Sequence, residues 1–292
     1  MHKVLILGAS GMLGNAMLRT FAEDGRYKVF GSVRTHATGK LFPEPLRQHL
    51  VVAGDIENQD ALIQLFGKVR PTVVVNCIGL IKQLAHAGDA LSAIPVNALL
   101  PHRIANLCAA TGARMVHVST DCVFAGRAGM YKETDTSDAE DLYGRSKLLG
   151  EVDYPHTITL RTSIIGQELA GANGLIGWFL KQEGKCDGYR KAIFSGLPTD
   201  ELARVVRDVV LPRPELSGLY HVASAPINKY DLLKLVAEVY GKQIDINPND
   251  KLVIDRSLNA DRFKAATGYV APTWRTLVEG MHRFQESNHV QG

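Results

Sequence analysis

The first fourteen residues constrain the fold more tightly than any other stretch of the chain. Residues 3–7 (KVLIL) form a short apolar run of the kind found in a buried parallel strand. Gly8, Gly11 and Gly14 follow at regular spacing, and a helical pattern then continues to about Ala22. A strand, a glycine-rich loop and a helix in this order predict the opening βα unit of an α/β fold.

Each of the three glycines has a use in a loop that binds a dinucleotide. Gly8 would allow a tight turn, Gly11 would let the backbone approach a pyrophosphate at the helix N-terminus, and Gly14 would permit close packing of helix on strand. The spacing is G-x-x-G-x-x-G rather than G-x-G-x-x-G, and a tight turn that binds no ligand is the alternative. The strand–loop–helix context favours the dinucleotide loop. Its expected cofactor contacts are Gly8, Ser10, Gly11, Met12, Leu13 and Gly14.

The end of the second strand bears on which dinucleotide is bound. This strand, residues 28–33 (KVFGSV), ends at Arg34. An NAD site usually has an Asp or Glu here for the ribose 2′-hydroxyl, whereas an arginine suits a 2′-phosphate. Because no acidic residue stands at this strand end, the sequence favours NADPH over NADH. A solvated arginine in a polar loop is the alternative.

The third strand adds further cofactor candidates. Residues 37–49 contain prolines and no strong periodicity, which predicts a loop, and residues 50–53 then form the strand. Asp55 and Ile56 follow it. Asp55 would either meet the amino group of the adenine or cap the helix expected at 58–67, and the sequence leaves both open.

The fourth strand, residues 71–76 (PTVVVN), is followed by Cys77, Ile78 and Gly79. A glycine at this point would let the chain pass close to the cofactor. We therefore expect these three residues to line the cofactor site.

A long helical stretch, residues 89–111, is interrupted by Pro95 and Pro101. Asn97 lies inside it and is a further cofactor-site candidate. Its side chain would either hydrogen-bond the backbone and a water or satisfy the break in the helix near Pro101.

The candidate chemistry lies at the fifth strand and the helix after it. Residues 114–119 end in Ser119, which we assign to the cofactor site, and deliver Thr120 to the edge where open parallel sheets bind ligands. Tyr143 and Lys147 are four residues apart, so they lie on one helix face. The ammonium would lower the pKa of the phenol toward neutrality, and the Thr120 hydroxyl would hold the same substrate oxygen. An exposed Tyr beside a solvated Lys is the alternative.

The complete pattern predicts a doubly wound parallel sheet, a Rossmann fold, with a smaller C-terminal substrate-binding lobe. The regular alternation of strands and helices ends after a sixth strand at 157–161. Only a short helix at 176–181 is evident between this strand and residue 200. We assign residues 1–165 to the dinucleotide-binding domain, with 197–222 returning to it. The lobe would comprise 166–196 and 223–292. After residue 200, elements are expected at 201–210 and 218–222 in the returning segment, and at 231–240, 261–267 and 274–284 in the lobe.

Composition excludes several classes of function. The net charge of the 292-residue chain is 33 − 30 = +3, too small and too dispersed for a nucleic-acid or membrane-surface protein. The four cysteines are scattered and the histidines show no metal-ligand spacing, so no metal is expected. No apolar run approaches the roughly 18 residues of a membrane span, and the N-terminus enters a strand without a signal peptide. These features predict a cytoplasmic protein.

With these elements in place, the chain resembles the extended short-chain dehydrogenase/reductases, and more narrowly the dTDP-4-dehydrorhamnose reductases. The matching segments span residues 3 to about 283: GASGMLG at 8–14, STDCVFAG at 119–126, YGRSKLLGE at 143–151, LRTSIIG at 160–166 and GLPT at 196–199.

The resemblance implies an NADPH-dependent reductase of a nucleotide-linked 4-keto-6-deoxy sugar, used in polysaccharide synthesis. Hydride would pass to C4 while Tyr143 protonates the oxygen, Lys147 holds the nicotinamide ribose and Thr120 positions the carbonyl, with Asn97 completing a proton relay. The segments around Ile165, Gly166, Phe194 and Thr199 would face the substrate lobe. The implied substrate contacts are Thr120, Asp121, Cys122, Tyr143 and Thr199.

Some positions depart from that pattern. Position 122 is Cys, where this branch usually has Tyr. In GDP-fucose synthases, a Cys at this place acts as an acid/base. An epimerase or an epimerase–reductase is therefore an open alternative. Those enzymes also use a His after the sixth strand, which residues 162–190 lack. The segment 192–199 also departs from the usual Asp-Gln-x-Gly-x-Pro-Thr, which leaves the sugar open.

Two features concern assembly. Some dimers of the family share a metal through a Glu after the third glycine, where this chain has Asn15 and Ala16, so the resemblance also implies no metal. Leu148, Leu149 and the apolar face of 89–111 would pair with a second copy in a homodimer or belong to the core. A regulatory subunit like the β subunit of methionine adenosyltransferase, which shares this fold, is a further alternative, although the Tyr–Lys pair is kept.

Overall fold

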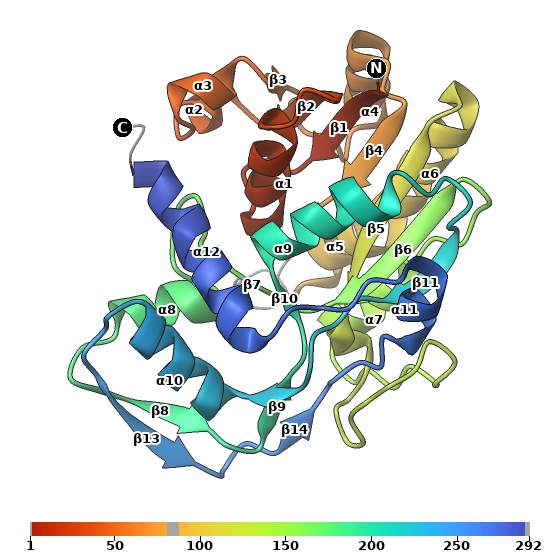
Figure 1. Ribbon diagram of the computed structural model, residues 1–292. Coiled ribbons are helices and arrows are strands. Elements are labelled where there is room, and N and C mark those ends of the chain that lie inside the picture. The colour runs from red at the N-terminus through yellow and green to blue at the C-terminus, as the bar shows by residue number, and fades with distance from the viewer. Residues whose placement is uncertain (1, 81–87, 290–292) are drawn as a thin grey trace.

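A parallel seven-stranded sheet forms the centre of the computed structural model, which describes residues 2–80 and 88–289 (Figure 1). The strands lie in the order β11-β6-β5-β4-β1-β2-β3. Their bounds are β1 His2–Leu7, β2 Tyr27–Val33, β3 Leu50–Val52, β4 Val73–Asn76, β5 Arg114–Thr120, β6 Thr157–Thr162 and β11 Gly218–His221. The order reverses between β1 and β4, and ligands of doubly wound sheets bind at the strand ends beside such a reversal. The predicted fold class is therefore confirmed.

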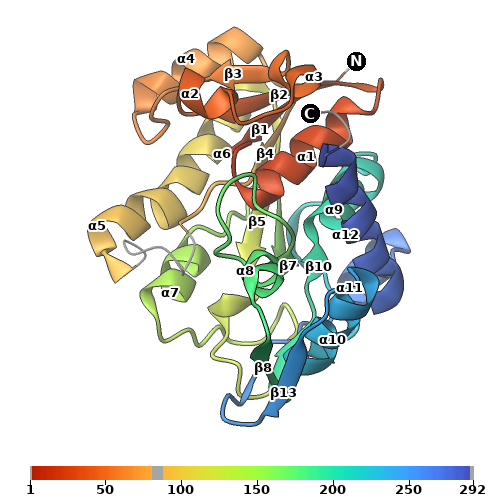
Figure 2. The ribbon, with the colours of Figure 1, turned by 90° about the vertical axis from the view of Figure 1, so that its left-hand side faces the viewer.

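Helices cover both faces of this sheet (Figure 2). One apolar cluster lies under α1, α9, α11 and α12, and another lies under α4 and α6. The bounds of these helices are α1 Met12–Ala22, α4 Gln59–Val69, α6 Leu100–Thr111, α9 Thr199–Arg204, α11 Asp261–Thr267 and α12 Trp274–His289. Because both faces are covered, the central strands are apolar on both sides, as the runs at 3–7 and 71–76 predicted.

One sequence expectation about these segments is wrong. The segment 37–49 is not a plain loop: it holds α2 (His36–Gly39) and α3 (Glu44–Arg47), which are too short to show a period in the sequence. The interruption expected at Pro95 and Pro101 takes the form of a π-helical segment (η2, Ile94–Leu99) between α5 (Ala90–Ala93) and α6, so the helical stretch changes its hydrogen-bonding pattern without ending.

The segment 197–222 lies against the central sheet. β10 (Leu197–Pro198) pairs with β7 (Ile164–Ile165), and β11 pairs with β6 in parallel register. Between them, α9 packs against α1 and is continued by a π-helical segment (η4, Val205–Val210).

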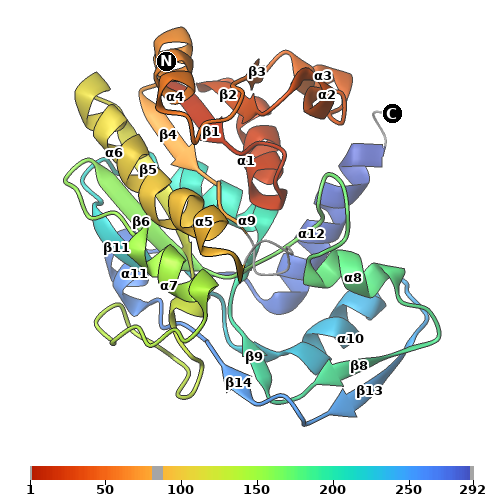
Figure 3. The ribbon, with the colours of Figure 1, turned by 180° about the vertical axis from the view of Figure 1, so that it is seen from behind.

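Residues 166–196 and 223–255 build a lobe beside the carboxyl ends of the sheet strands (Figures 1 and 3). Its strands form two small sheets, β8 with β13 and β12-β9-β14. The sequence pattern missed most of these strands because they are short and contain Gly, Asp, Asn or Pro, as in KCDGY and DINPN. The bounds are α8 Leu175–Lys181, β8 Lys185–Tyr189, β9 Ala192–Phe194, β12 Ile227–Asn228, α10 Lys229–Val239, β13 Asp245–Asn249 and β14 Ile254–Asp255. The helices α11 and α12, which the sequence assigned to the lobe, instead pack against β11 and α9 of the sheet domain, and α12 also contacts α10 of the lobe.

Within residues 2–80 and 88–289, no helix combines the length and apolar character needed to cross a membrane.

Candidate active site

The glycine-rich loop has the geometry of a phosphate-binding turn. Gly8 has φ +80°, and a Cβ there would lie 2.8 Å from Cγ1 of Ile78. A Cβ at Gly14 would lie 2.0 Å from the carbonyl oxygen of Gly8, so only glycine allows this approach of helix and loop. Ser10 and Gly11 are exposed at the N-terminus of α1, whose first turn contains no acidic residue. The residues present therefore fit a dinucleotide pyrophosphate.

The residues expected to contact the adenosine half lie exposed beyond β2 and β3. Arg34 follows β2 directly, and Asp55 follows β3. One of the two alternatives for Asp55 is wrong: Asn58 caps α4, accepting hydrogen bonds from the backbone N–H groups of Asp60 (2.9 Å) and Ala61 (3.2 Å). Asp55 instead accepts one from the N–H of Glu57 at 3.1 Å in a local turn, and the residue is exposed.

The end of β4 meets the helix that carries Lys147. A Cβ at Gly79 would lie 3.3 Å from Oδ1 of Asn97 and 3.8 Å from Nζ of Lys147. Asn97 is buried, accepts a hydrogen bond from the N–H of Leu80 at 2.8 Å and donates one to Oγ of Ser146 at 3.2 Å. Its amide therefore ties the loop after β4 to α7 (Leu142–Leu149), which is the backbone-bonding alternative of the two that the sequence left open.

Thr120, Tyr143 and Lys147 lie together at the carboxyl edge of the sheet. Thr120 ends β5, and its hydroxyl accepts a hydrogen bond from the N–H of Cys122 at 3.1 Å and donates one to Oδ1 of Asp121 at 3.3 Å. It is also near enough to the Tyr143 phenol to favour a lower pKa of that group. Lys147 Nζ donates to the carbonyl oxygen of Val118 at 3.0 Å. The adjacent elements β5 and α7 thus carry a hydroxyl, a phenol and an amine at one edge of the sheet.

The expected lowering of the Tyr143 pKa is not what this structure gives. Burial raises the pKa of the phenol, and the Thr120 contact opposes that rise only in part. Burial also lowers the pKa of Lys147 to about 8, with Glu151 acting in the opposite direction. The nearby lysine was expected to dominate the pKa of the phenol, whereas burial has the larger effect on the pKa of both groups in the folded chain.

Cys122 lies near positively charged side chains of the C-terminal lobe, which the sequence did not indicate. It lies in a 3-10 turn (η3, Asp121–Val123) that Thr120 caps, its N–H donating to Oγ1 of Thr120 at 3.1 Å. Arg256 approaches from the lobe: its Nη1 lies 3.7 Å from the Cys122 sulfur. Burial raises the pKa of the thiol to about 12. Arg256 and its neighbour Lys229 were missed because they belong to no motif and lie over 100 residues from Cys122 in the chain.

A buried ion pair between Arg161 and Glu151 links the elements that carry the site residues. Arg161 makes two hydrogen bonds of 2.7 Å to the two carboxylate oxygens of Glu151, and the side chains are 5% and 11% exposed. Ser119 donates to the same carboxylate at 2.6 Å. Glu151 therefore joins β5, β6 and the end of α7, the elements that carry Thr120, Tyr143 and Lys147. The sequence contained both residues in its motifs but gave neither a role.

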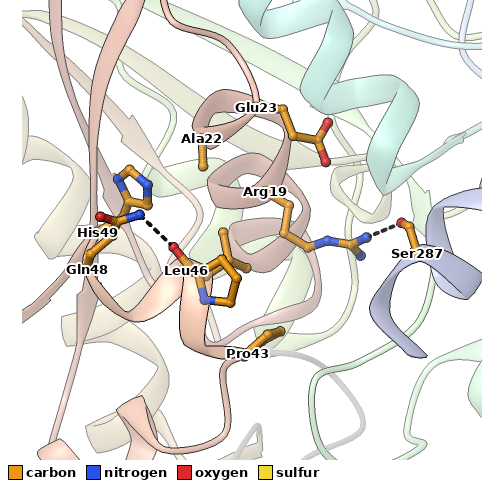
Figure 4. Close-up of a pocket in the computed structure, with 9 residues that line it drawn as sticks. Arg19, Ala22, Glu23, Pro43, Leu46, Gln48, His49 and Ser287 are labelled. Carbon is orange, nitrogen blue, oxygen red and sulfur yellow. Dashed lines mark hydrogen bonds between the residues drawn. The ribbon is translucent and has the colours of Figure 1, made fainter. Parts of the chain in front are cut away.

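Two cavities lie away from this constellation. One, of about 220 Å³, is lined by residues of α1, α3 and α12 such as Arg19, Leu46 and Ser287, and none of the predicted site residues lines it (Figure 4). The other, of about 210 Å³, is lined by Met12 and Thr199, but not by Thr120, Tyr143 or Lys147. Thr199 is buried, with Oγ1 close above Gly166. Thr199 thus lies against Gly166 at the start of α9.

Comparison with known proteins gives a consistent set of relatives. The family model described as RmlD substrate binding domain matches residues 1–283. The dTDP-4-dehydrorhamnose reductase of Escherichia coli is 27% identical over 310 residues, covering 95% of this chain and 96% of the relative. Subunit beta of methionine adenosyltransferase 2 from Danio rerio is 27% identical over 253 residues, covering 82% and 74%. A structure of dTDP-4-dehydrorhamnose reductase from Bacillus anthracis in complex with NADP superposes with a TM-score of 0.78 at 20% identity, covering 97% and 99%.

Proposed function

Because this chain belongs to the RmlD substrate binding domain family and is an NAD(P)-dependent oxidoreductase of the extended short-chain type, we propose that it reduces a nucleotide-linked 4-keto-6-deoxy sugar. The substrate we favour is dTDP-4-dehydro-L-rhamnose, and the product dTDP-L-rhamnose. The observation that carries the proposal is the meeting of Thr120, Tyr143 and Lys147 at the sheet edge beside the glycine-rich loop. Residues 1–165 would hold the cofactor, and the C-terminal lobe would cover the sugar nucleotide.

The three side chains have separate roles at the carbonyl oxygen of the substrate. The nicotinamide supplies hydride when it is bound. Tyr143 donates a proton to the oxygen as its negative charge develops, and the Thr120 hydroxyl holds that oxygen in place. Lys147, buried beside Gly79 and Asn97, is placed to hold the nicotinamide ribose and to replace the proton that Tyr143 gives up.

The raised pKa of Tyr143 suits the reductive direction. A phenol that stays protonated at neutral pH is ready to donate, whereas the reverse oxidation would need the phenolate. The phenol is therefore in the protonation state that the proton-donating step of the reduction requires.

We also propose NADPH over NADH, on the strength of Arg34. Arg34→Ala is expected to raise KM for NADPH by about 10- to 100-fold, since a hydrogen bond to a charged phosphate contributes roughly 1.5–3 kcal/mol. KM for NADH, which lacks the 2′-phosphate, serves as the internal control and should change little. Steady-state kinetics with both cofactors measures this. Equal changes in KM for NADPH and for NADH would show that Arg34 does not bind the 2′-phosphate.

The epimerase alternative rests on Cys122, and the structure weakens it. A thiol whose pKa is raised to about 12 is a poor base at neutral pH, although Arg256 acts to lower that pKa. NADPH oxidation with dTDP-4-keto-6-deoxyglucose, with and without an added 3,5-epimerase, separates the two functions. We expect turnover only with the epimerase present. Turnover without it would favour the alternative or direct reduction of the unepimerised sugar.

A further inference from the structure

A buried polar pair lies in the central sheet, directly before the loop that follows β4. His117 on β5 and Asn76, the last residue of β4, are register partners in the parallel sheet and are 0% and 1% exposed. Nδ2 of Asn76 is 3.1 Å from Nδ1 of His117. An imidazole and an amide are thus buried together at a position where parallel sheets usually hold apolar side chains.

The hydrogen bonds of this pair determine which nitrogen of the imidazole carries the proton. Oδ1 of Asn76 accepts a hydrogen bond from the backbone N–H of Ile78 at 3.1 Å, and this donor fixes the orientation of the amide. Because the amide nitrogen that faces His117 can only donate, Nδ1 of His117 accepts, and the ring is neutral with its proton on Nε2. Burial lowers the pKa of His117 well below its usual range, and the charge of Lys147 acts in the same direction.

The other nitrogen of the ring makes the bond to Asn76 the important one. Among the described residues, Nε2 of His117 has no hydrogen-bond partner, although it is buried. A buried donor without a partner costs free energy, so this imidazole stabilises the fold less than a well-packed apolar side chain would. Such groups in folded proteins call for a functional explanation, and here the group in use is Nδ1.

Asn76 in turn connects the imidazole to the glycine-rich loop. Its side chain holds the N–H of Ile78, and Ile78 packs directly on the tight turn at Gly8. A Cβ at Gly8 would lie 2.8 Å from Cγ1 of Ile78, so the two segments are in close contact. A chain of contacts therefore runs from His117 through Asn76 and Ile78 to Gly8.

We propose that His117 is a positioning residue for the cofactor, which accepts the Asn76 amide at Nδ1 and so holds residues 77–79 against Gly8. This inference rests on the proposed cofactor site, which residues 77–79 are expected to line. Without the acceptor at Nδ1, the Asn76 amide loses its fixed orientation and its grip on the N–H of Ile78. The effect should fall on cofactor affinity rather than on proton transfer, because the contacts lead to the glycine-rich loop and not to Tyr143.

The test compares His117→Leu, which removes the acceptor, with His117→Asn, which offers Oδ1 in place of Nδ1. NADPH is titrated by the fluorescence of its reduced nicotinamide, without a sugar substrate. His117→Leu should raise Kd for NADPH by about 5- to 10-fold, the usual effect of one lost hydrogen bond, whereas His117→Asn should stay within about twofold of wild type. In turnover at saturating NADPH, kcat should stay within about threefold for both variants.

His156→Leu is the matched control. His156 directly precedes β6, and its Nε2 donates to the carbonyl oxygen of Ala105 at 2.8 Å, outside the contacts that lead from His117 to Gly8. Its Kd for NADPH should match the wild type. Thermal melts identify any variant that fails to fold. Nitrogen NMR of the wild-type imidazoles is an independent measurement, since the proposal requires His117 to be neutral and protonated at Nε2.

Three results would overturn the assignment. They are a folded His117→Leu variant with wild-type Kd, a His117→Asn variant that loses as much affinity as His117→Leu, and a ring protonated at Nδ1. If His117→Leu does not fold, wild-type affinity in His117→Asn with an Nε2-protonated ring supports the assignment, and a loss of affinity in His117→Asn overturns it. A wild type that binds NADPH but reduces no keto-sugar would contradict the proposed substrate, while the titration would still test His117.

Discussion

Tyr143→Phe is expected to lower kcat for keto-sugar reduction by about 10²- to 10⁴-fold, the usual contribution of a positioned general acid. The substitution keeps the ring and removes only the phenolic hydroxyl, the group proposed to donate the proton. NADPH oxidation at saturating substrate measures the loss. KM for NADPH should stay within about threefold, because the phenol gives up a proton rather than binding the cofactor phosphates.

A parallel Tyr154→Phe variant provides the control for that experiment. Tyr154 is also a tyrosine with a hydrogen-bonded hydroxyl, 3.0 Å from Nδ1 of His102, but it lies outside the constellation. Its kcat should remain near wild type. A Tyr143→Phe enzyme that keeps more than about a tenth of wild-type kcat would contradict the assignment of Tyr143 as proton donor.

Glu151→Ala is expected to destabilise the fold by about 3–5 kcal/mol, because it leaves the Arg161 guanidinium buried without its carboxylate. Arg161 is 5% exposed, and the substitution also removes the acceptor of Ser119. Urea unfolding measures the change in free energy of unfolding. Since Glu151 connects the strand of Thr120 with the helix of Tyr143, turnover should fall as well.

The exposed pair Arg190–Asp250 gives the matched comparison. Asp250→Ala also removes a carboxylate that makes two hydrogen bonds to one arginine, but both side chains are largely exposed to water. Its effect on unfolding should be much smaller, because solvent replaces the lost partner. Similar losses for both variants would show that burial does not govern the Glu151–Arg161 pair.

The sequence predicted the elements that show a clear hydrophobic period and are bounded by turn-forming residues such as glycine. β1, the glycine loop and α1 appear where the run at 3–7 and the three glycines placed them. The lobe strands escaped notice because pairs such as β8 with β13 are brief, rich in turn residues, and joined across about 60 residues of sequence. Local pattern carries little information about such contacts.

The residues of the candidate site also fall into two groups: those that local spacing in the sequence predicts and those that only tertiary packing brings together. Thr120, Tyr143 and Lys147 could be found because one helix and one strand end fix their spacing. Lys229 and Arg256 could not, since only the packing of the lobe brings them to Cys122. The pKa of Tyr143 was predicted in the wrong direction because burial, which dominates it, depends on neighbours from several elements.

The most direct test of the proposed function follows the hydride itself. NADPH in which deuterium replaces both hydrogens at C4 of the nicotinamide is incubated with the enzyme, dTDP-4-keto-6-deoxyglucose and 3,5-epimerase, and the sugar product is examined by mass spectrometry and proton NMR. The proposed reaction predicts one transferred deuterium, at C4 of the product sugar, and none with Tyr143→Phe over the same time. Oxidation of NADPH that leaves the sugar without deuterium at C4, or no turnover at all, would contradict it.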